Sequence, residues 1–360
     1  MQREAKTDPS ASPQGVKPWW HRGAGIAATL AIGCTGGVIA WLTHVPLPWM
    51  LGPLLAAAAF GLLGGPVHPV REARTFGQVI VGASIGLQFT QALLLKILLL
   101  TPLIAVVSLF SILVGAINAV ILMRLSGLDR TTAFFATTPG GVVEMMNQAG
   151  RYGAELEPIA VTQTMRVCLI VVFAPLLVIH FSVSGAAVPP VPSVPWLIFI
   201  GLVILGAIGG YAMAYWSLPN AWMMGPMIIA GIFGAMGLIE GRGPDLLLIA
   251  AQVAMGTSLG TMFRREFLTR LLPLMLTSIL VVVLTAGTLA AVAIAIAYAL
   301  ALPPATMVLA LAPAGMAEMV VTGKLLGLDA TLITGFQLLR IILILVLCRP
   351  AYLLFRRVVG

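Results

Sequence analysis

The feature that most restricts the fold is a series of long apolar segments that charged residues barely interrupt. Charged residues are only 9% of the chain, whereas soluble globular domains carry about 25%. Hydrophobic residues make up 60% of it. The apolar segments are about 17–30 residues long, the length of a bilayer-crossing helix, and they lack the alternation of a membrane β-barrel. The sequence therefore predicts an all-α polytopic protein embedded in a lipid bilayer.

Six apolar segments in the first half of the chain have six counterparts in the second half. The first six are 23–43, 49–64, 76–89, 97–123, 131–149 and 159–181, and the second six are 196–216, 222–238, 246–263, 272–302, 305–323 and 330–347. The predicted division is a basic cytoplasmic tail (1–22), membrane repeat 1 (23–181), a Pro-rich periplasmic connector (182–195), membrane repeat 2 (196–348) and a basic cytoplasmic C-terminus (349–360).

The two halves match in sequence as well as in pattern. Residues 46–53 read PLPWMLGP, and residues 219–226 read PNAWMMGP. Residues 137–146 read TTPGGVVEMM, and residues 311–320 read LAPAGMAEMV. The second pair places Pro139, Gly141 and Glu144 opposite Pro313, Gly315 and Glu318. Chance is a poor explanation for such agreement, so the chain is interpreted as an internal duplication.

The distribution of Lys and Arg predicts that the two copies are inverted. The basic N-terminus and the loops holding Arg71, Arg74, Arg124 and Arg130 are assigned to the cytoplasm by the positive-inside rule. Of the equivalent loops in the second copy, 240–245 is net acidic and 299–304 carries no charge. Conversely, a basic loop at 264–270 matches a loop of the first copy that holds only Lys96. Both termini are then cytoplasmic, and each copy crosses the membrane an odd number of times.

An odd number of crossings from six segments requires one segment that does not span. The segments at 131–149 and 305–323, which Pro and Gly interrupt, are the candidates for re-entrant elements. We expect two inverted repeats with about ten transmembrane helices plus two re-entrant or broken segments, the pattern of secondary transporters. Lys324 falls on the outer side in this arrangement, where a long side chain can snorkel. The alternative is a parallel topology with twelve crossings.

Deep ionisable residues are few and come in matched pairs. Glu144 and Glu318 lie in the interrupted segments, and Arg166 and Arg340 lie inside the last helix of each repeat. A charge near the bilayer centre costs about 2.5–3.5 kcal/mol on insertion scales. The simplest hypothesis is therefore that each Glu faces an Arg. Such a pair serves either as a structural salt bridge or as a substrate or coupling-ion site.

The chemistry of the interrupted segments leaves two kinds of ligand open. A helix break exposes backbone N–H groups, which with two arginines suit a carboxylate, sulfonate or phosphate. Carboxylates not paired with Arg suit Na⁺ or H⁺ instead. The candidate substrate- or ion-binding residues are Glu144, Glu318, Arg166, Arg340, Gln163, Gln337, Gly140, Gly141, Gly315, Pro139 and Pro313.

Other function classes find no support in the residues. The histidines are far apart and form no ligand cluster with carboxylates, so neither a metal nor a cofactor is predicted. No catalytic arrangement or phosphate-binding loop is present, which predicts that the protein is not an enzyme. The net charge of +8 lies in loops and tails without interleaved aromatics, so no nucleic-acid partner is predicted.

The duplicated PxxWM[LM]GP element, together with PGGVVEMM at 139–146 and PAGMAEM at 313–319, resembles the AbrB family of bacterial inner-membrane proteins. The resemblance covers almost the whole chain after residue 22. It implies a polytopic, transporter-like protein of the bacterial inner membrane. The family carries an old label as putative ammonia monooxygenase and a name tied to the regulation of gene expression. It supplies no accepted active-site residues.

The sequence thus predicts an inner-membrane secondary transporter of a small solute, with an anion as one option and with H⁺ or Na⁺ coupling at the Glu and Arg pairs. A homodimer is one option for its assembly, since transporters of this kind often form one. The alternative is a membrane-embedded regulator or sensor that acts without transport. A sensor should carry a sizeable soluble output module, and the largest polar segment here is the 22-residue tail. An oxygenase is the third and least favoured reading.

Overall fold

The computed structural model describes residues 19–359, apart from 46, 69, 182–191, 217, 219, 240, 264 and 266–271. Most of the predicted tail and connector, and most of the basic loop at 264–270, therefore lie outside the described residues, as do Pro46 and Pro219 of the duplicated element.

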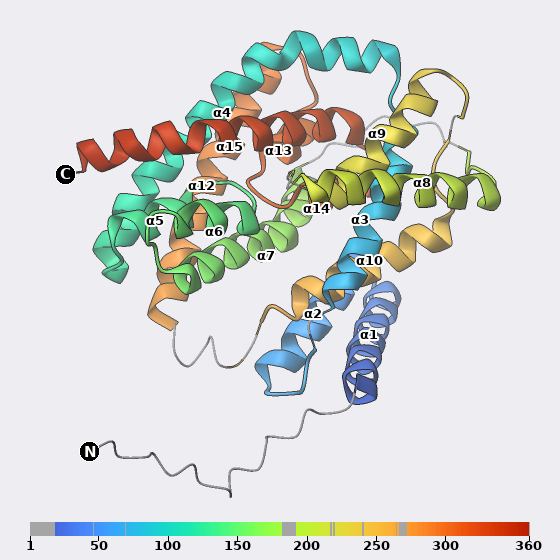
Figure 1. The fold of residues 1–360 in the computed structure, drawn as a ribbon, viewed down its shortest axis with the longest axis horizontal. Coiled ribbons are helices and arrows are strands. Elements are labelled where there is room, and N and C mark those ends of the chain that lie inside the picture. The colour runs from blue at the N-terminus through green and yellow to red at the C-terminus, as the bar shows by residue number, and fades with distance from the viewer. Residues whose placement is uncertain are drawn as a thin grey trace, which may run out of the picture.

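The named elements of the described chain are all α-helices (Figure 1). The first half contains α1 (Trp19–Leu42), α2 (Pro48–Leu62), α3 (Arg71–Gly86), α4 (Gln91–Ser126), α5 (Arg130–Thr137), α6 (Val142–Gly150) and α7 (Leu156–Phe181). The second half contains α8 (Trp196–Tyr215), α9 (Ala221–Ala235), α10 (Asp245–Gly260), α12 (Leu272–Ala299), α13 (Pro304–Leu311), α14 (Met316–Leu325) and α15 (Ala330–Val358). The all-helical prediction is confirmed.

Six of these helices are long and apolar enough to cross a membrane: α1, α4, α7, α8, α12 and α15. Three others, α2, α9 and α10, are apolar but have only 15 or 16 residues. At a rise of about 1.5 Å per residue, such helices are shorter than the hydrocarbon core of a bilayer. The expected number of ten spanning helices therefore stays a prediction.

The expectation that Arg71 and Arg74 lie in a loop is wrong. Helix α3 begins at Arg71 and carries a polar first turn ahead of its apolar part. In this first turn Arg71 is exposed and Arg74 is half-buried. The rest of the helix, from Val79 to Gly86, is buried. A short apolar run is therefore extended by one helical turn whose charged side chains reach a partner or solvent.

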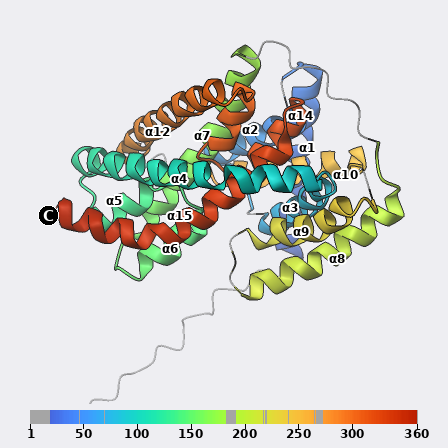
Figure 2. The same ribbon diagram turned by 90° about the horizontal axis from the view of Figure 1, so that it is seen from above.

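The helices form two bundles (Figures 1 and 2). Bundle A contains α1, α2 and α3 with α8, α9 and α10, and bundle B contains α4–α7 with α12–α15. Each bundle therefore takes matching helices from both halves of the chain. Contacts also come in matched sets: α3 packs on α9 as α10 packs on α2, and α4 packs on α5 as α12 packs on α13. Helices α3 and α10 cross in the centre of bundle A, and α14 of bundle B contacts α3.

Glycines allow the close crossings inside bundle A. A Cβ at Gly82 of α3 would overlap the carbonyl oxygen of Met223 in α9, and a Cβ at Gly256 of α10 would overlap that of Met50 in α2. Each crossing thus requires a residue without a side chain. The hydrophobic core then continues from Met50 and Met223 in bundle A to Met307 and Phe336 in bundle B.

Candidate functional site

Two helix breaks lie in bundle B and have the same local geometry. Helix α5 ends at Thr137 and α6 begins at Val142, while α13 ends at Leu311 and α14 begins at Met316. At each break one tight backbone hydrogen bond closes the turn, from Gly140 N to the Thr138 oxygen (2.8 Å) and from Ala314 N to the Ala312 oxygen (2.9 Å). The predicted interruptions at Pro139 and Pro313 are confirmed as breaks between two short helices. Proline ends a helix because it lacks the N–H that would continue it.

In the first break, Gln163 and Arg166 bind the end of α5. Gln163 Nε2 donates to the carbonyl oxygens of Phe135 (2.8 Å) and Thr138 (2.9 Å). Arg166 donates to the oxygens of Thr138 (3.1 Å) and Gly140 (2.6 Å). The last carbonyls of a helix have no partner within it and carry the negative end of its dipole. The two side chains, one turn apart on α7, satisfy these carbonyls in a buried site.

The second break repeats this arrangement with one difference. Gln337 Nε2 donates to the oxygens of Leu309 (2.9 Å) and Ala312 (3.1 Å), and Arg340 Nη1 donates to the oxygen of Ala312 (2.9 Å). The other terminal nitrogen of Arg340 donates to Gln337 Oε1, whereas Arg166 uses it to bind a backbone carbonyl. Sequence reasoning placed each Gln and Arg on one face of one helix, and the structure confirms that placement.

The two glutamates lie at the starts of the second half-helices. Each occupies the third position of its helix, and each side chain folds back over the N-cap glycine. A Cβ at Gly141 would overlap Oε2 of Glu144, and a Cβ at Gly315 would overlap Oε2 of Glu318. A carboxylate is stabilised there by the positive end of the helix dipole. The three-residue spacing between glycine and acid, which both halves of the chain share, thus has a steric reason.

The pairing of these glutamates with Arg166 and Arg340 is not found. Glu318 Oε1 accepts a bond of 2.7 Å from Arg74 of α3, which belongs to bundle A. Glu318 is 1% exposed, and its Oε2 has no hydrogen-bond partner among the described residues. Glu144 is half-buried and forms no ion pair within the described part of the chain. The arginines of α7 and α15 instead donate to carbonyl groups at the ends of α5 and α13 and, for Arg340, also to Gln337.

Arg74 is the site residue that sequence reasoning missed. It was assigned to a loop, and its counterpart in the second copy is the apolar Leu248. The sequence does hold one signal for this residue: Arg74 is a charge next to a short apolar segment, and the other half of the chain has no charge at the matching position. The Arg74–Glu318 pair makes the two copies different and joins the two bundles.

Replacing Arg74 by glutamine is expected to lower the free energy of unfolding by about 2 kcal/mol. Removing one partner of a buried pair leaves the other charge unpaired, and the loss is below the usual range for such pairs because Arg74 is 25% exposed. The double variant Arg74→Gln/Glu318→Gln should recover most of this stability. Thermal unfolding in detergent measures the stability of the single and the double variant. A double variant that is no more stable than Arg74→Gln would contradict the ion pair.

Positive charge is in excess around the breaks. Arg74, Arg166, Lys324 and Arg340 lie on helices at or beside the breaks, together with the two carboxylates Glu144 and Glu318. Among the described residues, no three His, Cys, Asp or Glu side chains gather in a way that could hold a metal ion. The chemistry available at the breaks is therefore that of arginine, carboxylate and backbone amide groups.

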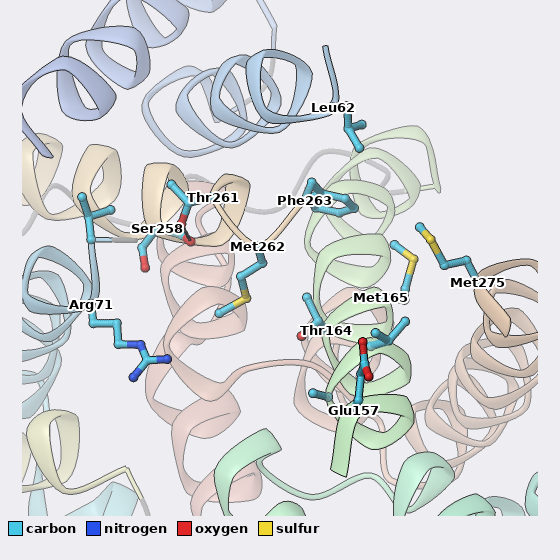
Figure 3. A pocket seen from close by; sticks show the side chains of 13 residues that line it. Leu62, Arg71, Glu157, Thr164, Met165, Ser258, Thr261, Met262, Phe263 and Met275 are labelled. Carbon is cyan, nitrogen blue, oxygen red and sulfur yellow. Dashed lines mark hydrogen bonds between the residues drawn. The ribbon is translucent and has the colours of Figure 1, made fainter. Parts of the chain in front are cut away.

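Two cavities lie at opposite ends of the α3/α10 pair, between the bundles. One, of about 260 Å³, is lined by the start of α3, the end of α10 and the side of α7. Figure 3 shows Arg71 on one side of it and Glu157 on the other, with Ser258 and Thr261 near Arg71. The other, of about 530 Å³, is lined by the end of α3, the start of α10 and α14. Arg74 falls between the two along α3.

Comparison with known proteins agrees with the duplicated motifs. A model of the family described as "Transition state regulatory protein AbrB" matches residues 49–356. A protein of Bacillus subtilis (strain 168) named "Uncharacterized protein YhjN" is 28% identical over 359 residues, covering 92% of this chain and 93% of its own. A protein of Escherichia coli (strain K12) named "Putative regulator AbrB" is 28% identical over 310 residues, covering 84% and 88%. The chain belongs to the AbrB family.

Proposed function

We propose that the protein is a secondary transporter that moves a small anionic solute past the two helix breaks. The observation that carries the proposal is the duplicated pair of buried arginines, Arg166 and Arg340, which have no carboxylate within ion-pairing distance among the described residues. Two buried positive charges are costly unless something negative neutralises them. Carbonyl groups at the ends of α5 and α13 supply part of that compensation, and a bound anion would supply more.

The second half-helices strengthen this choice of ligand. The first amide groups of α6 and α14 have no partner within their own helix and attract negative charge. Arg166 and Arg340 lie on the helices that pack against α6 and α14. A solute carboxylate, sulfonate or phosphate could therefore meet arginine and backbone N–H groups together, the arrangement expected where discontinuous helices bind a solute.

Coupling to H⁺ or Na⁺ is proposed at the two glutamates. Glu144 has no ion pair within the described residues, and Glu318 has one oxygen without a hydrogen-bond partner. A carboxylate oxygen without a partner retains the capacity to take up a proton or a cation. Both lie beside the break that would hold the anion, so cation and anion would partly neutralise each other.

The division into two bundles supports alternating access. Both cavities have walls from bundle A and bundle B and lie at opposite ends of the α3/α10 pair. Movement of one bundle against the other would open one cavity while closing the other, as transporters built from repeats do. The proposed setting is the bacterial inner membrane, with both termini in the cytoplasm and with a homodimer as the assembly.

Cysteine labelling tests the proposed inversion of the two copies. Ser126 and Leu300 occupy equivalent positions between the long fourth helix of each copy and its broken segment. We expect Ser126→Cys and Leu300→Cys to react with a membrane-impermeant maleimide from opposite sides. The exposed Cys34 must first be replaced by serine, whereas Cys168 and Cys348 are buried. Labelling from the same side would rule out inverted repeats and favour the parallel topology.

A thermal-shift screen tests the transport site itself. Small carboxylates, sulfonates and phosphates are added at several pH values, with and without Na⁺, to the wild type and to Glu144→Gln and Glu318→Gln. A ligand at about one hundred times its Kd should stabilise the protein by about 2.7 kcal/mol. Any stabilising anion is then tested for uptake into proteoliposomes. If no ligand or cation stabilises the protein and both variants behave like the wild type, the proposal is wrong.

The alternative function is regulation of gene expression from the membrane without transport. What favours it is the name "Putative regulator AbrB" of the Escherichia coli relative and the description of the family model. Solute uptake by the purified protein would separate the two functions, since a regulator that acts only through a partner should show none.

A further inference from the structure

The larger cavity, of about 530 Å³, lies between α14 of bundle B and the helices α2, α3 and α10 of bundle A. Its volume is in the range of sites for small molecules, about 300–1,000 Å³. The lining is mostly apolar and includes Trp49, Val81, Leu248 and Val321. A few polar side chains gather at α14 and at the start of α10. This combination is typical of a site that orients an apolar molecule by one polar group.

Lys324 and Ser84 form the polar centre of this cavity. Lys324 Nζ donates to Ser84 Oγ (2.7 Å), and the backbone N–H of Gly243 donates to the same oxygen (2.9 Å). A hydroxyl accepts two hydrogen bonds and donates one. Since both acceptor positions are used, the Ser84 proton is left to donate. The ammonium keeps two further N–H groups that find no hydrogen-bond acceptor among the described residues.

Among the described residues that line the cavity, the net charge is that of Lys324. Arg242 and Asp245 also line it, and Arg242 donates through both terminal nitrogens to the Asp245 carboxylate. This hydrogen bonding raises the pKa of Arg242, and the pair is neutral overall. Lys324 has no carboxylate within 4.0 Å in the described part of the chain. One ammonium with unused donors therefore faces a largely apolar cavity.

We infer that this cavity binds an organic monoanion, a carboxylate with a small apolar body. The carboxylate would accept from Lys324, whose ammonium the fully buried Ser84 holds in place, and the apolar body would lie against Trp49, Leu248 and Val321. The site belongs to one copy of the repeat, because the counterpart of Lys324 is Gly150 whereas Ser84 has the counterpart Ser258. It lies at the end of α14 away from the second helix break, and the inference holds whether or not the protein transports a solute.

Benzoate, with benzamide as its neutral analogue, is the probe that tests this site. The full-length protein in nanodiscs of zwitterionic lipid is titrated by calorimetry. We expect benzoate to bind at least tenfold more tightly than benzamide, since a hydrogen bond to a charged group is worth a factor of ten or more. Lys324→Met should weaken benzoate at least tenfold and leave benzamide unchanged. Ser84→Ala should weaken benzoate severalfold.

Matched controls separate this site from the others. Arg71→Met removes one positive charge from the smaller cavity and should not change benzoate binding, and thermal unfolding confirms that each variant folds. Equal affinity of wild type and Lys324→Met, or of benzoate and benzamide, would overturn the inference. So would complete loss of benzoate binding when one fifth of the lipid is anionic, since the cavity would then be a headgroup site. Failure here leaves the helix breaks untouched, because their test uses other variants and solute uptake.

Discussion

Replacing Arg166 by leucine is expected to destabilise the protein by about 3 kcal/mol or more, whereas Arg340→Leu should cost about half as much. Arg166 is the side chain that donates to the buried carbonyl oxygen of Gly140, and it shares the Thr138 oxygen with Gln163. A buried acceptor left without a donor costs about 1–3 kcal/mol. After loss of Arg340, the Ala312 oxygen still accepts from Gln337. The acceptor that loses its donor is Oε1 of Gln337, which belongs to a side chain and can readjust, unlike the fixed backbone carbonyl of Gly140. Thermal unfolding in detergent compares the two variants.

This difference in stability separates a structural role from a role in binding. If the arginines only close the helix breaks, ligand affinity should follow stability and fall further in Arg166→Leu. If both arginines contact the anion, both variants should lose ligand-induced stabilisation to the same extent, although one is more stable. Arg356→Leu, an exposed arginine on the same helix as Arg340, is the control and should change stability by less than about 0.5 kcal/mol. A wild-type melting temperature for Arg166→Leu would contradict the described contacts.

The position of the breaks could be predicted from the sequence because the cause is local. Pro139 and Pro313 remove an N–H, and small residues surround them, so each interruption follows from a few neighbouring residues. The alignment of Gln163 with Arg166 was also predictable, since residues three apart share a helical face. That both side chains turn back to carbonyl groups of the preceding segment depends on how α5 packs on α7, which no local pattern records.

The partner of Glu318 could not be predicted for a related reason. Pairing it with Arg340 assumed that matched residues interact, but the carboxylate reaches Arg74 of the other bundle. That contact depends on the tertiary packing of α14 on α3. The contact of Lys324 likewise depends on tertiary packing and cannot be predicted from the local sequence. The sequence predicts a snorkelling side chain at a helix end, whereas its ammonium is hydrogen-bonded to Ser84 across the boundary between the bundles.

The double variant Gly82→Ala/Gly256→Ala is expected to lose several kcal/mol of stability or fail to yield folded protein. Each added Cβ would overlap a backbone carbonyl oxygen, of Met223 and of Met50 respectively. A backbone cannot rotate away as a side chain can, so whole helices must move apart. Overpacking typically costs about 1–3 kcal/mol at one site, and costs at separate interfaces add. Yield of monodisperse protein and its melting temperature provide the measurement.

The expected loss of stability is opposite to the usual effect, because glycine-to-alanine changes normally stabilise a helix by up to about 1 kcal/mol. Gly287, in the middle of α12, has nothing within 4 Å of an added Cβ, so Gly287→Ala should be neutral or stabilising. The single variants at Gly82 and Gly256 should lose similar amounts of stability, since each glycine occupies the equivalent crossing in its own copy. Stabilisation by either one would mean that α3 and α10 do not cross their partners as described. A large loss in only one would mean that the duplicated motifs no longer pack alike, and alternating access by two equivalent halves would lose its structural basis.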